Sequence, residues 1–500
     1  MKRIIIIFMA IVILFVFASC KSVENNVQNN SSVAVASTEP FVLAKLSGET
    51  LNPILAKSNT NLELLRLCYD GLIRLNGEYE PELIIAENYS QNGNTFEFTI
   101  KPNAKFWDGS AVTAKDIEYS YKQAQSAASS FSSRFSYISS YNVKGEAFTV
   151  LMNSTAKRNL NLLDIPIIKK DSDKNSLFPI GSGRYYLTEA NGTYALKANT
   201  NWIMGNTFGI QEIQLTDVPD MNTLYHTFSS GDVTAVFADI NGSGASYTGD
   251  IDIKEFSVNT LTFIGTNFSK GYLTDKRIRK AISQAINRPK LVSETLLTHA
   301  ESAWHPFNPK WKEVSGIDLP KDIYSRDEAA ALLDEALFTK GKSGKRGAGG
   351  AETIITILVS NDNRYKTDTA AKIAEDLSKV DINAQVKAVN PDEYLNLINS
   401  GNFDLFLGEV KIPQNMDINI LFSPAVNKGN WSSETFIKAL SDYNNGLTGL
   451  DTAITAFSDE CPFIPLYYKN CALAVSRNVT GEILPVQNDI FGGIQNWAMK

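Results

Sequence analysis

Strand-like and helix-like segments alternate in the last third of the chain, and this alternation constrains the fold more than any other feature. The order is strand, helix, strand, helix, strand, over TIITILV at Thr353 to Val359, Thr369 to Val380, INAQVKAV, Asp392 to Ser400 and FDLFLGEV. Parallel neighbouring strands need a helical crossover between them, so this order predicts parallel strands in one lobe. The same mixture continues upstream, and the chain as a whole is predicted to be an α/β protein.

The length of the chain predicts more than one domain. About 460 of the 500 residues follow the N-terminal segment, which is too many for one compact core, and we expect two or three domains. A hydrophobic content of 43% with 20% charged residues is ordinary for a soluble globular protein. The formal net charge of -7 argues against a nucleic-acid partner.

The first twenty residues have the layout of an export signal. Lys2 and Arg3 precede the apolar run Ile4 to Phe17, and small residues and Cys20 follow it. As a helix, this run would span about 21 Å, whereas a membrane span must cross about 30 Å. We therefore expect residues 1–19 to be a cleaved signal peptide and the polar residues 20–40 to be a flexible tether.

A cysteine at the cleavage point resembles the lipobox of bacterial lipoproteins, in which that cysteine carries the lipid. The resemblance implies that Cys20 is lipidated and anchors the exported protein to the bacterial cell membrane, facing the periplasm or the cell exterior. The alternative is an ordinary signal peptide followed by an incidental cysteine. Three cysteines remain, and an odd count leaves their pairing open: Cys461 and Cys471 could form a bridge, and Cys68 is predicted to be a buried apolar residue.

The sequence carries no motif of a known enzyme class. Its three histidines have no metal-binding spacing, and no G-x-S-x-G nucleophile motif is present. The basic segment GKSGKRGAGG, at 341–350, has Ala336 where a phosphate-binding loop needs its first glycine, so we expect an exposed loop there. The chain is predicted to be neither an enzyme nor a protein with a metal or other cofactor.

Six sequence blocks, in order from Leu51 to the C-terminus, are similar to those of the family 5 solute-binding proteins, which include the peptide receptors of ABC transporters. The blocks are LNPILAKSNTNLELLRLCYDGLIRLNGEYEPELIIAENYS, KFWDGSAVTAKDIEYSY, PIGSGRYYL, LTDKRIRKAISQAINRPKLV, YSRDEAAALLDEA and CPFIPLYY. Arg184, in the third block, replaces the family's proline. Trp107 and Asp108, in the second block, are predicted to hold a structural corner, and Thr113 and Asp116 to cap the helix that follows.

The resemblance implies a bilobed fold of the type II periplasmic-binding-protein kind, in its large three-domain form, with two lobes joined by crossing segments. The expected parts are lobe I (41–75, 175–257 and 475–500), accessory domain II (76–174) and lobe II (258–474). Such a receptor is expected to be a monomer that captures a small solute, most often a short peptide, in the cleft between the lobes. It would deliver the solute to the permease subunits of an ABC importer.

The resemblance also places two segments against an extended peptide ligand. By position they are Lys57, Ser58 and Asn59 in lobe I, and Gly408, Glu409 and Val410 in lobe II.

The aspartate that holds the peptide's amino group in many relatives is missing. Ile412 stands near its place, and Asp417 follows five residues later. Glu409 could replace it as a cationic anchor, or could instead pair with Lys411 or Lys57. Sugar, nickel and haem ligands occur on the same fold, and a surface lipoprotein that binds host or matrix macromolecules is a further alternative.

Overall fold

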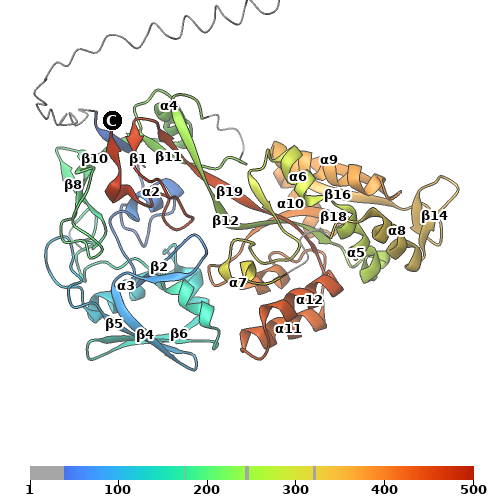
Figure 1. The fold of residues 1–500 in the computed structure, drawn as a ribbon, viewed down its shortest axis with the longest axis horizontal. Helices are drawn as coiled ribbons and strands as arrows, with labels where there is room; N and C mark the ends of the chain where they lie inside the picture. The colour runs from blue at the N-terminus through green and yellow to red at the C-terminus, as the bar shows by residue number, and fades with distance from the viewer. Residues whose placement is uncertain (1–38, 175, 243–246, 319–322) are drawn as a thin grey trace, which may run out of the picture. The chain divides into compact units, whose positions relative to one another are not determined.

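The computed structural model describes residues 39–500 except 175, 243–246 and 319–322 (Figure 1). The predicted signal peptide, Cys20 and nearly all of the predicted tether lie outside the described residues. Within the described part of the chain, no helix has both the length and the apolar character that crossing a membrane requires.

A four-stranded sheet near the N-terminus belongs to the residues assigned to lobe I. Its order is β1 (Phe41–Leu46), β10 (Glu212–Val218), β9 (Thr193–Ala198) and β8 (Tyr185–Ala190). β1 runs parallel to β10, and the other pairs are antiparallel. The helices of this part are α2 (Asn59–Leu65) and α4 (Met221–Ser229), and the short pair β20 (Val479–Thr480) and β21 (Ala498–Met499) lies at the C-terminus.

A second four-stranded sheet is antiparallel and lies wholly within residues 76–174. Its order is β4 (Ala86–Asn92), β5 (Thr95–Ile100), β7 (Ala147–Met152) and β6 (Ile138–Lys144). Helix α3 (Ala114–Ala124) packs on it through Tyr121, whose ring lies 4.8 Å from that of Phe148. The hairpin of β2 (Ile73–Leu75) and β3 (Pro81–Leu83) precedes this sheet.

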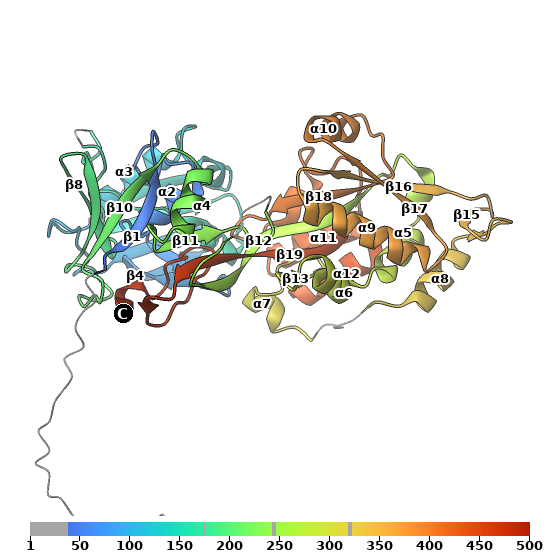
Figure 2. The ribbon, with the colours of Figure 1, turned by 90° about the horizontal axis from the view of Figure 1, so that it is seen from above.

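The largest sheet contains the two segments that join the lobes. Its order is β11 (Ala235–Ala238), β19 (Ile464–Ser476), β12 (Ile251–Thr266), β18 (Leu405–Lys411), β16 (Ile354–Ser360) and β17 (Asn383–Val389), and β13 (Ala300–Ser302) pairs with β19. β12 and β19 lie side by side in both views (Figures 1 and 2) and are the crossing segments of the predicted bilobed fold. The expected domain boundaries at 257/258 and 474/475 fall inside these two strands.

The parallel strands predicted near the end of the chain are present. β16 runs parallel to both β17 and β18. Alternate residues of β16 face opposite sides: Ile355 and Ile357 pack in one core and Leu358 in another. The first core includes residues of α5 (Lys276–Ala285), α6 (Arg288–Thr295), α8 (Arg326–Glu335) and α9 (Arg364–Ser378); the second includes residues of α7 (Lys312–Ser315), α10 (Pro391–Asn399), α11 (Glu434–Asn444) and α12 (Leu450–Glu460).

The segment GKSGKRGAGG is only partly the loop that the sequence predicts. Its second half forms β15 (Arg346–Ala348), which pairs with β14 (Phe338–Lys340). Arg346 is buried and donates to Asp334 at 2.6 Å and to the carbonyl oxygen of Phe338 at 3.1 Å. These contacts stabilise a β-strand in a segment whose glycine-rich and basic sequence predicts a loop.

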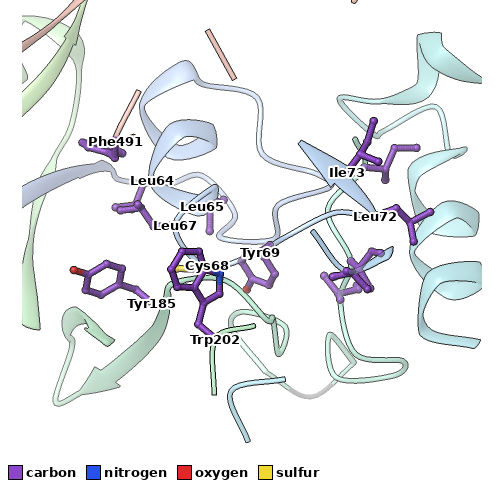
Figure 3. Close-up of a cluster of buried hydrophobic side chains, with 14 of the residues drawn as sticks. Leu64, Leu65, Leu67, Cys68, Tyr69, Leu72, Ile73, Tyr185, Trp202 and Phe491 are labelled. Carbon is purple, nitrogen blue, oxygen red and sulfur yellow. The ribbon is translucent and has the colours of Figure 1, made fainter. Parts of the chain in front are cut away.

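Two of the family blocks meet around Cys68. Figure 3 shows Cys68 among the side chains of Leu65, Tyr69 and Trp202, and Cys68 is buried as predicted. The PIGSG segment crosses the backbone here so closely that a Cβ atom on Gly181 would lie 2.2 Å from the Cys68 carbonyl oxygen. The glycine therefore has a packing role.

The turn at Trp107 is a structural corner, as predicted. Trp107 stacks on Tyr186 of β8 with ring centroids 4.7 Å apart, and Asp108 accepts a hydrogen bond from Lys169 at 2.6 Å. The Asp116 carboxylate accepts from the amide of Thr113 at 2.9 Å and from its hydroxyl, which closes the start of α3.

Candidate functional site

A cleft of about 1010 Å³ lies where the crossing strands, lobe I, the accessory domain and lobe II meet. Its size is at the upper end of the ~300 to 1,000 Å³ of small-molecule pockets. Polar or charged side chains line it from every side: Ser58, Asn59, Glu63, Arg66, Arg134, Tyr137, Asp239, Glu409, Lys411, Gln414, Lys469 and Gln487. Apolar side chains such as Phe131, Phe237 and Phe256 line it as well, so the cleft is suited to a solute that has both polar and apolar groups.

Three of the six predicted ligand residues line this cleft: Ser58, Asn59 and Glu409. Lys57, Gly408 and Val410 are not among the lining residues. Val410 is buried in the core beneath the sheet, and a Cβ atom on Gly408 would lie 2.8 Å from the rings of Phe263 and Phe406.

The alternation of side chains along β18 explains this division. Glu409 and Lys411 share one face of the strand and line the cleft, whereas Gly408 and Val410 share the other face. The resemblance pointed to a strand that lines the cleft, and the strand's period of two shows which of its side chains face the cleft. Lys411 is a further residue of the cleft lining, which the period could have revealed from the sequence.

One edge of β18 has no β16 partner beyond Phe406. The Ile412 amide donates to the Asn259 carbonyl oxygen at 2.8 Å, so alternation along the antiparallel ladder points the Val410 and Gly408 peptide groups toward β12. The Glu409 peptide groups then point to the opposite edge. β16 pairs with that edge only at Leu405 and Phe406, so its pairing ends before Glu409.

The first predicted segment is already hydrogen-bonded within the protein. Glu49 accepts from the amides of Lys57 and Ser58, the latter at 2.7 Å, and from the Ser58 hydroxyl. Ser58 also caps α2 by accepting from the Asn61 amide. Burial opposes ionisation of Glu49, but these hydrogen bonds outweigh it and keep its pKa below the ordinary value. The amides of Lys57 and Ser58 already donate to Glu49 and are not available to a ligand. Asn59 also lines the cleft, and its amide is not held by Glu49.

Glu409 has a partner that the sequence did not indicate. Its Oε1 atom lies 3.7 Å from Lys469 Nζ, and neither Lys411 nor Lys57 forms an ion pair with it. Lys469 also contacts Asp239 at 3.4 Å. Burial lowers the pKa of Lys469, but the carboxylates of Glu409 and Asp239 outweigh burial and raise it overall. Of the two interpretations that the sequence left open, the pairing of Glu409 with Lys411 or Lys57 is not formed. Its ion-pair partner among the described residues is Lys469 of β19, a strand that β12 separates from β18.

Two arginines of the cleft lining, one in lobe I and one in the accessory domain, are also paired. Arg66 Nε lies 3.5 Å from Glu63 Oε2, and Arg134 Nη1 donates to Asp164 at 2.6 Å. Burial raises the pKa of Glu63 to about 7, against the opposing effect of Arg66. At neutral pH Glu63 is therefore only partly ionised.

The residues near the missing aspartate do not replace it. Ile412 is fully buried, and Asp417 accepts hydrogen bonds from the Tyr137 hydroxyl at 3.0 Å and from the Asn419 amide at 3.1 Å. The Tyr137 contact joins the accessory domain to lobe II at the rim of the cleft.

The described residues contain no cluster of three or more histidine, cysteine, aspartate or glutamate side chains that could hold a metal ion. Cys68, Cys461 and Cys471 are all free thiols, so the Cys461–Cys471 bridge that the sequence permitted is not formed. Burial raises the pKa of Cys471, which lines the cleft, to about 12.

The sequence profile of the bacterial extracellular solute-binding proteins, family 5, matches residues 78–432. The chain belongs to this family. This membership agrees with the bilobed solute-receptor fold described above.

Relatives of known name or structure cover nearly the whole chain. The oligopeptide-binding protein AppA of Bacillus subtilis (strain 168) is 23% identical over 100% of this chain and 99% of its own length. The unliganded open form of MppA, a periplasmic murein tripeptide binding protein, superposes with a TM-score of 0.76 at 18% identity and covers 93% of this chain and 98% of its own. NikZ from Campylobacter jejuni, in complex with Ni(L-His), reaches a TM-score of 0.63 at 18% identity, with 92% and 99% covered. At these identities the structures establish the shared fold.

Proposed function

We propose that the chain is the solute receptor of an ABC importer and that it captures a short peptide in the cleft between its lobes. The observation that carries this proposal is the position of Glu409 on β18: its peptide groups face an edge that β16 leaves unpaired. An extended peptide can add to such an edge as a further strand. The names of the relatives, which include oligopeptide- and tripeptide-binding proteins, support the same ligand class.

The contacts proposed for the peptide differ in kind between the two walls. On lobe II, backbone pairing at Glu409 would supply affinity that does not depend on the peptide's side chains. On lobe I, Asn59 offers an amide side chain, whereas the amides of Lys57 and Ser58 are held by Glu49. We therefore propose a strand addition on one wall only.

Delivery to a permease would follow closure of the two lobes, and Cys20 would tether the receptor to the membrane. A single acyl chain binds membranes only marginally, so a multiply acylated cysteine would be needed for a stable anchor. Replacement of Cys20 by Ala should abolish incorporation of labelled fatty acid in the producing bacterium. Label retained by the Cys20→Ala protein would contradict the anchor and leave the peptide proposal untouched.

The peptide proposal is tested by native mass spectrometry of the purified protein, followed by calorimetric titration with a set of tri- and tetrapeptides. A bound peptide should stabilise the protein by RT ln(1 + [L]/Kd), about 2.7 kcal/mol at a hundredfold excess over Kd, and reduce its radius of gyration in solution scattering. A sugar or a nickel chelate in the cleft would contradict the peptide ligand but preserve the receptor. Binding of a matrix protein away from the cleft, with no small solute, would contradict both.

A further inference from the structure

We propose that Lys411 recognises a carboxylate of the ligand and so gives this cleft a preference for an anionic group next to β18. This inference rests on the proposed function, because it assigns the chemistry of one end of the peptide site. The observation behind it is that Lys411 lines the cleft and forms no ion pair within the described residues 39–500, gaps excepted.

The other three cations that line the cleft are already occupied. Lys469 lies within 4 Å of both Glu409 and Asp239. Arg134 pairs with Asp164 and donates to the carbonyl oxygen of Leu162 at 2.9 Å.

Arg66 is the remaining cation. It lies beside Glu63 and donates to the carbonyl oxygen of Asn488 at 2.9 Å. Lys411 is thus the one cationic side chain of the cleft lining that the described residues leave without an acidic partner.

The surroundings of Lys411 favour an anion. Burial and the Arg66 guanidinium lower the pKa of Lys411, and the Glu63 carboxylate only partly offsets them. Glu63 is itself a weak counter-charge near neutral pH, since its pKa is raised to about 7. Lys411 is exposed to the open cleft, and a ligand that fills the cleft would remove water from around it. A charge-assisted hydrogen bond from Lys411 to a ligand carboxylate would then be stronger than one in bulk water.

The position of Lys411 matters for the type of peptide bound. The residue after it, Ile412, is buried, and it stands where the resemblance leads one to expect an aspartate for a peptide's amino group. At this end of β18 the side chain offered to the ligand is therefore positive. A cationic group would be repelled there, and the carboxylate of a free C-terminus or of an acidic side chain would be attracted.

The test combines a change in the protein with a change in the ligand. Wild-type protein and the Lys411→Met variant are titrated with trialanine, with trialanine amide and with Ala-Glu-Ala amide. We expect wild type to bind a carboxylate-bearing peptide at least tenfold more tightly than trialanine amide, equivalent to about 1.4 kcal/mol, and Lys411→Met to lose this difference. Preference for trialanine identifies the C-terminus as the source of the carboxylate, and preference for Ala-Glu-Ala amide identifies the side chain.

Two further variants serve as controls. Lys411→Arg keeps the charge and should keep the preference. Lys438→Met removes the same charge from an exposed site on α11 and should leave every affinity unchanged. Thermal unfolding of each variant checks that it is folded. If Lys411→Met retained the wild-type preference, or if wild type bound acid and amide equally, Lys411 would not be the carboxylate site.

The role of Lys411 can be tested even if the ligand is not a peptide. If none of the three peptides binds, native mass spectrometry compares the solute that co-purifies with wild type and with Lys411→Met. An anionic solute that is lost from the variant would support Lys411 although the ligand is not a peptide. A neutral or cationic solute carried by both proteins, or no solute in either, would contradict the role of Lys411.

Discussion

Arg184 donates a hydrogen bond from Nη2 to Asp489 Oδ1 at 2.6 Å, and the two residues are 305 positions apart in the chain. Both are buried, and Arg74 contacts the other carboxylate oxygen of Asp489 at 3.1 Å. Burial opposes ionisation of Asp489, but the two guanidinium groups outweigh it and hold its pKa below the ordinary value. The ion pair thus fixes the C-terminal segment against the block PIGSGRYYL, in which Arg184 replaces the family's proline.

Asp489→Asn should destabilise the protein strongly. The change leaves Arg184, which is 3% exposed, without its counter-charge, and breaking a buried pair by removing one partner costs about 3 to 5 kcal/mol. Chemical denaturation measures this loss. The matched control is Asp250→Asn, which removes one of the two exposed carboxylates that pair with Arg477 and should cost about 0 to 1 kcal/mol. Equal losses in the two variants would contradict the structural role of Asp489.

The fold was largely predictable from the sequence because its signals are local. The strand-like segments TIITILV and FDLFLGEV and the helices between them predicted the parallel strands β16 and β18. The resemblance of six sequence blocks to the family implied the bilobed architecture. The hairpin at Arg346 was missed because its stability comes from Asp334 and from the carbonyl oxygen of Phe338, which a glycine-rich sequence does not reveal.

The site was less predictable because its charges meet through tertiary contacts. Lys469 and Glu409 are 60 positions apart in the sequence and lie on different strands. The register of β18, β12 and β19 decides that Glu409 pairs with Lys469 and not with Lys411. In the same way, only the fold brings the Glu49 carboxylate onto the amides of Lys57 and Ser58. Lys411 was the exception, since the strand period alone places it beside Glu409.

Glu63 should make stability depend on pH just below neutrality. Its pKa is raised from 4.5 to about 7 by burial, against the opposing effect of Arg66, so the folded protein holds a proton that the unfolded chain releases. The free energy of unfolding should therefore fall as pH rises from about 4.5 to 7 and change no further through this group above that range. Glu63→Gln should remove this part of the pH dependence, as denaturation at a series of pH values would measure. A variant with the wild-type slope between pH 4.5 and 7 would show that other groups cause it.

The three free thiols should be unreactive in the folded protein. Cys68, Cys461 and Cys471 are buried, and burial raises the pKa of each, to about 12 for Cys471. Because the thiolate is the reactive species, a thiol reagent at pH 8 should label these residues only after denaturation. Peptide mapping should find all three labelled in denatured protein without prior reduction. A requirement for reductant would indicate that Cys461 and Cys471 are bridged in the isolated protein.

Glu409→Gln should weaken peptide binding by less than about fivefold. Glu409 is half-exposed and pairs with Lys469 at 3.7 Å, so a ligand's ammonium group would have to compete with that lysine for it. An exposed or partly exposed pair contributes about 0 to 1 kcal/mol, and 1 kcal/mol corresponds to roughly a fivefold change in Kd. Titration of trialanine into wild-type and Glu409→Gln protein measures the difference. A loss of a hundredfold or more would instead identify Glu409 as the cationic anchor.

The double variant Glu409→Gln with Asp239→Asn tests the reason behind this small effect. Each single change leaves Lys469 one carboxylate, whereas the double change leaves this nearly buried ammonium with neither. The loss in the free energy of unfolding should therefore exceed the sum of the two single losses, because the two carboxylates share one partner. Additive losses would mean that Lys469 does not depend on this pair, and Glu409 would then be free to meet a ligand.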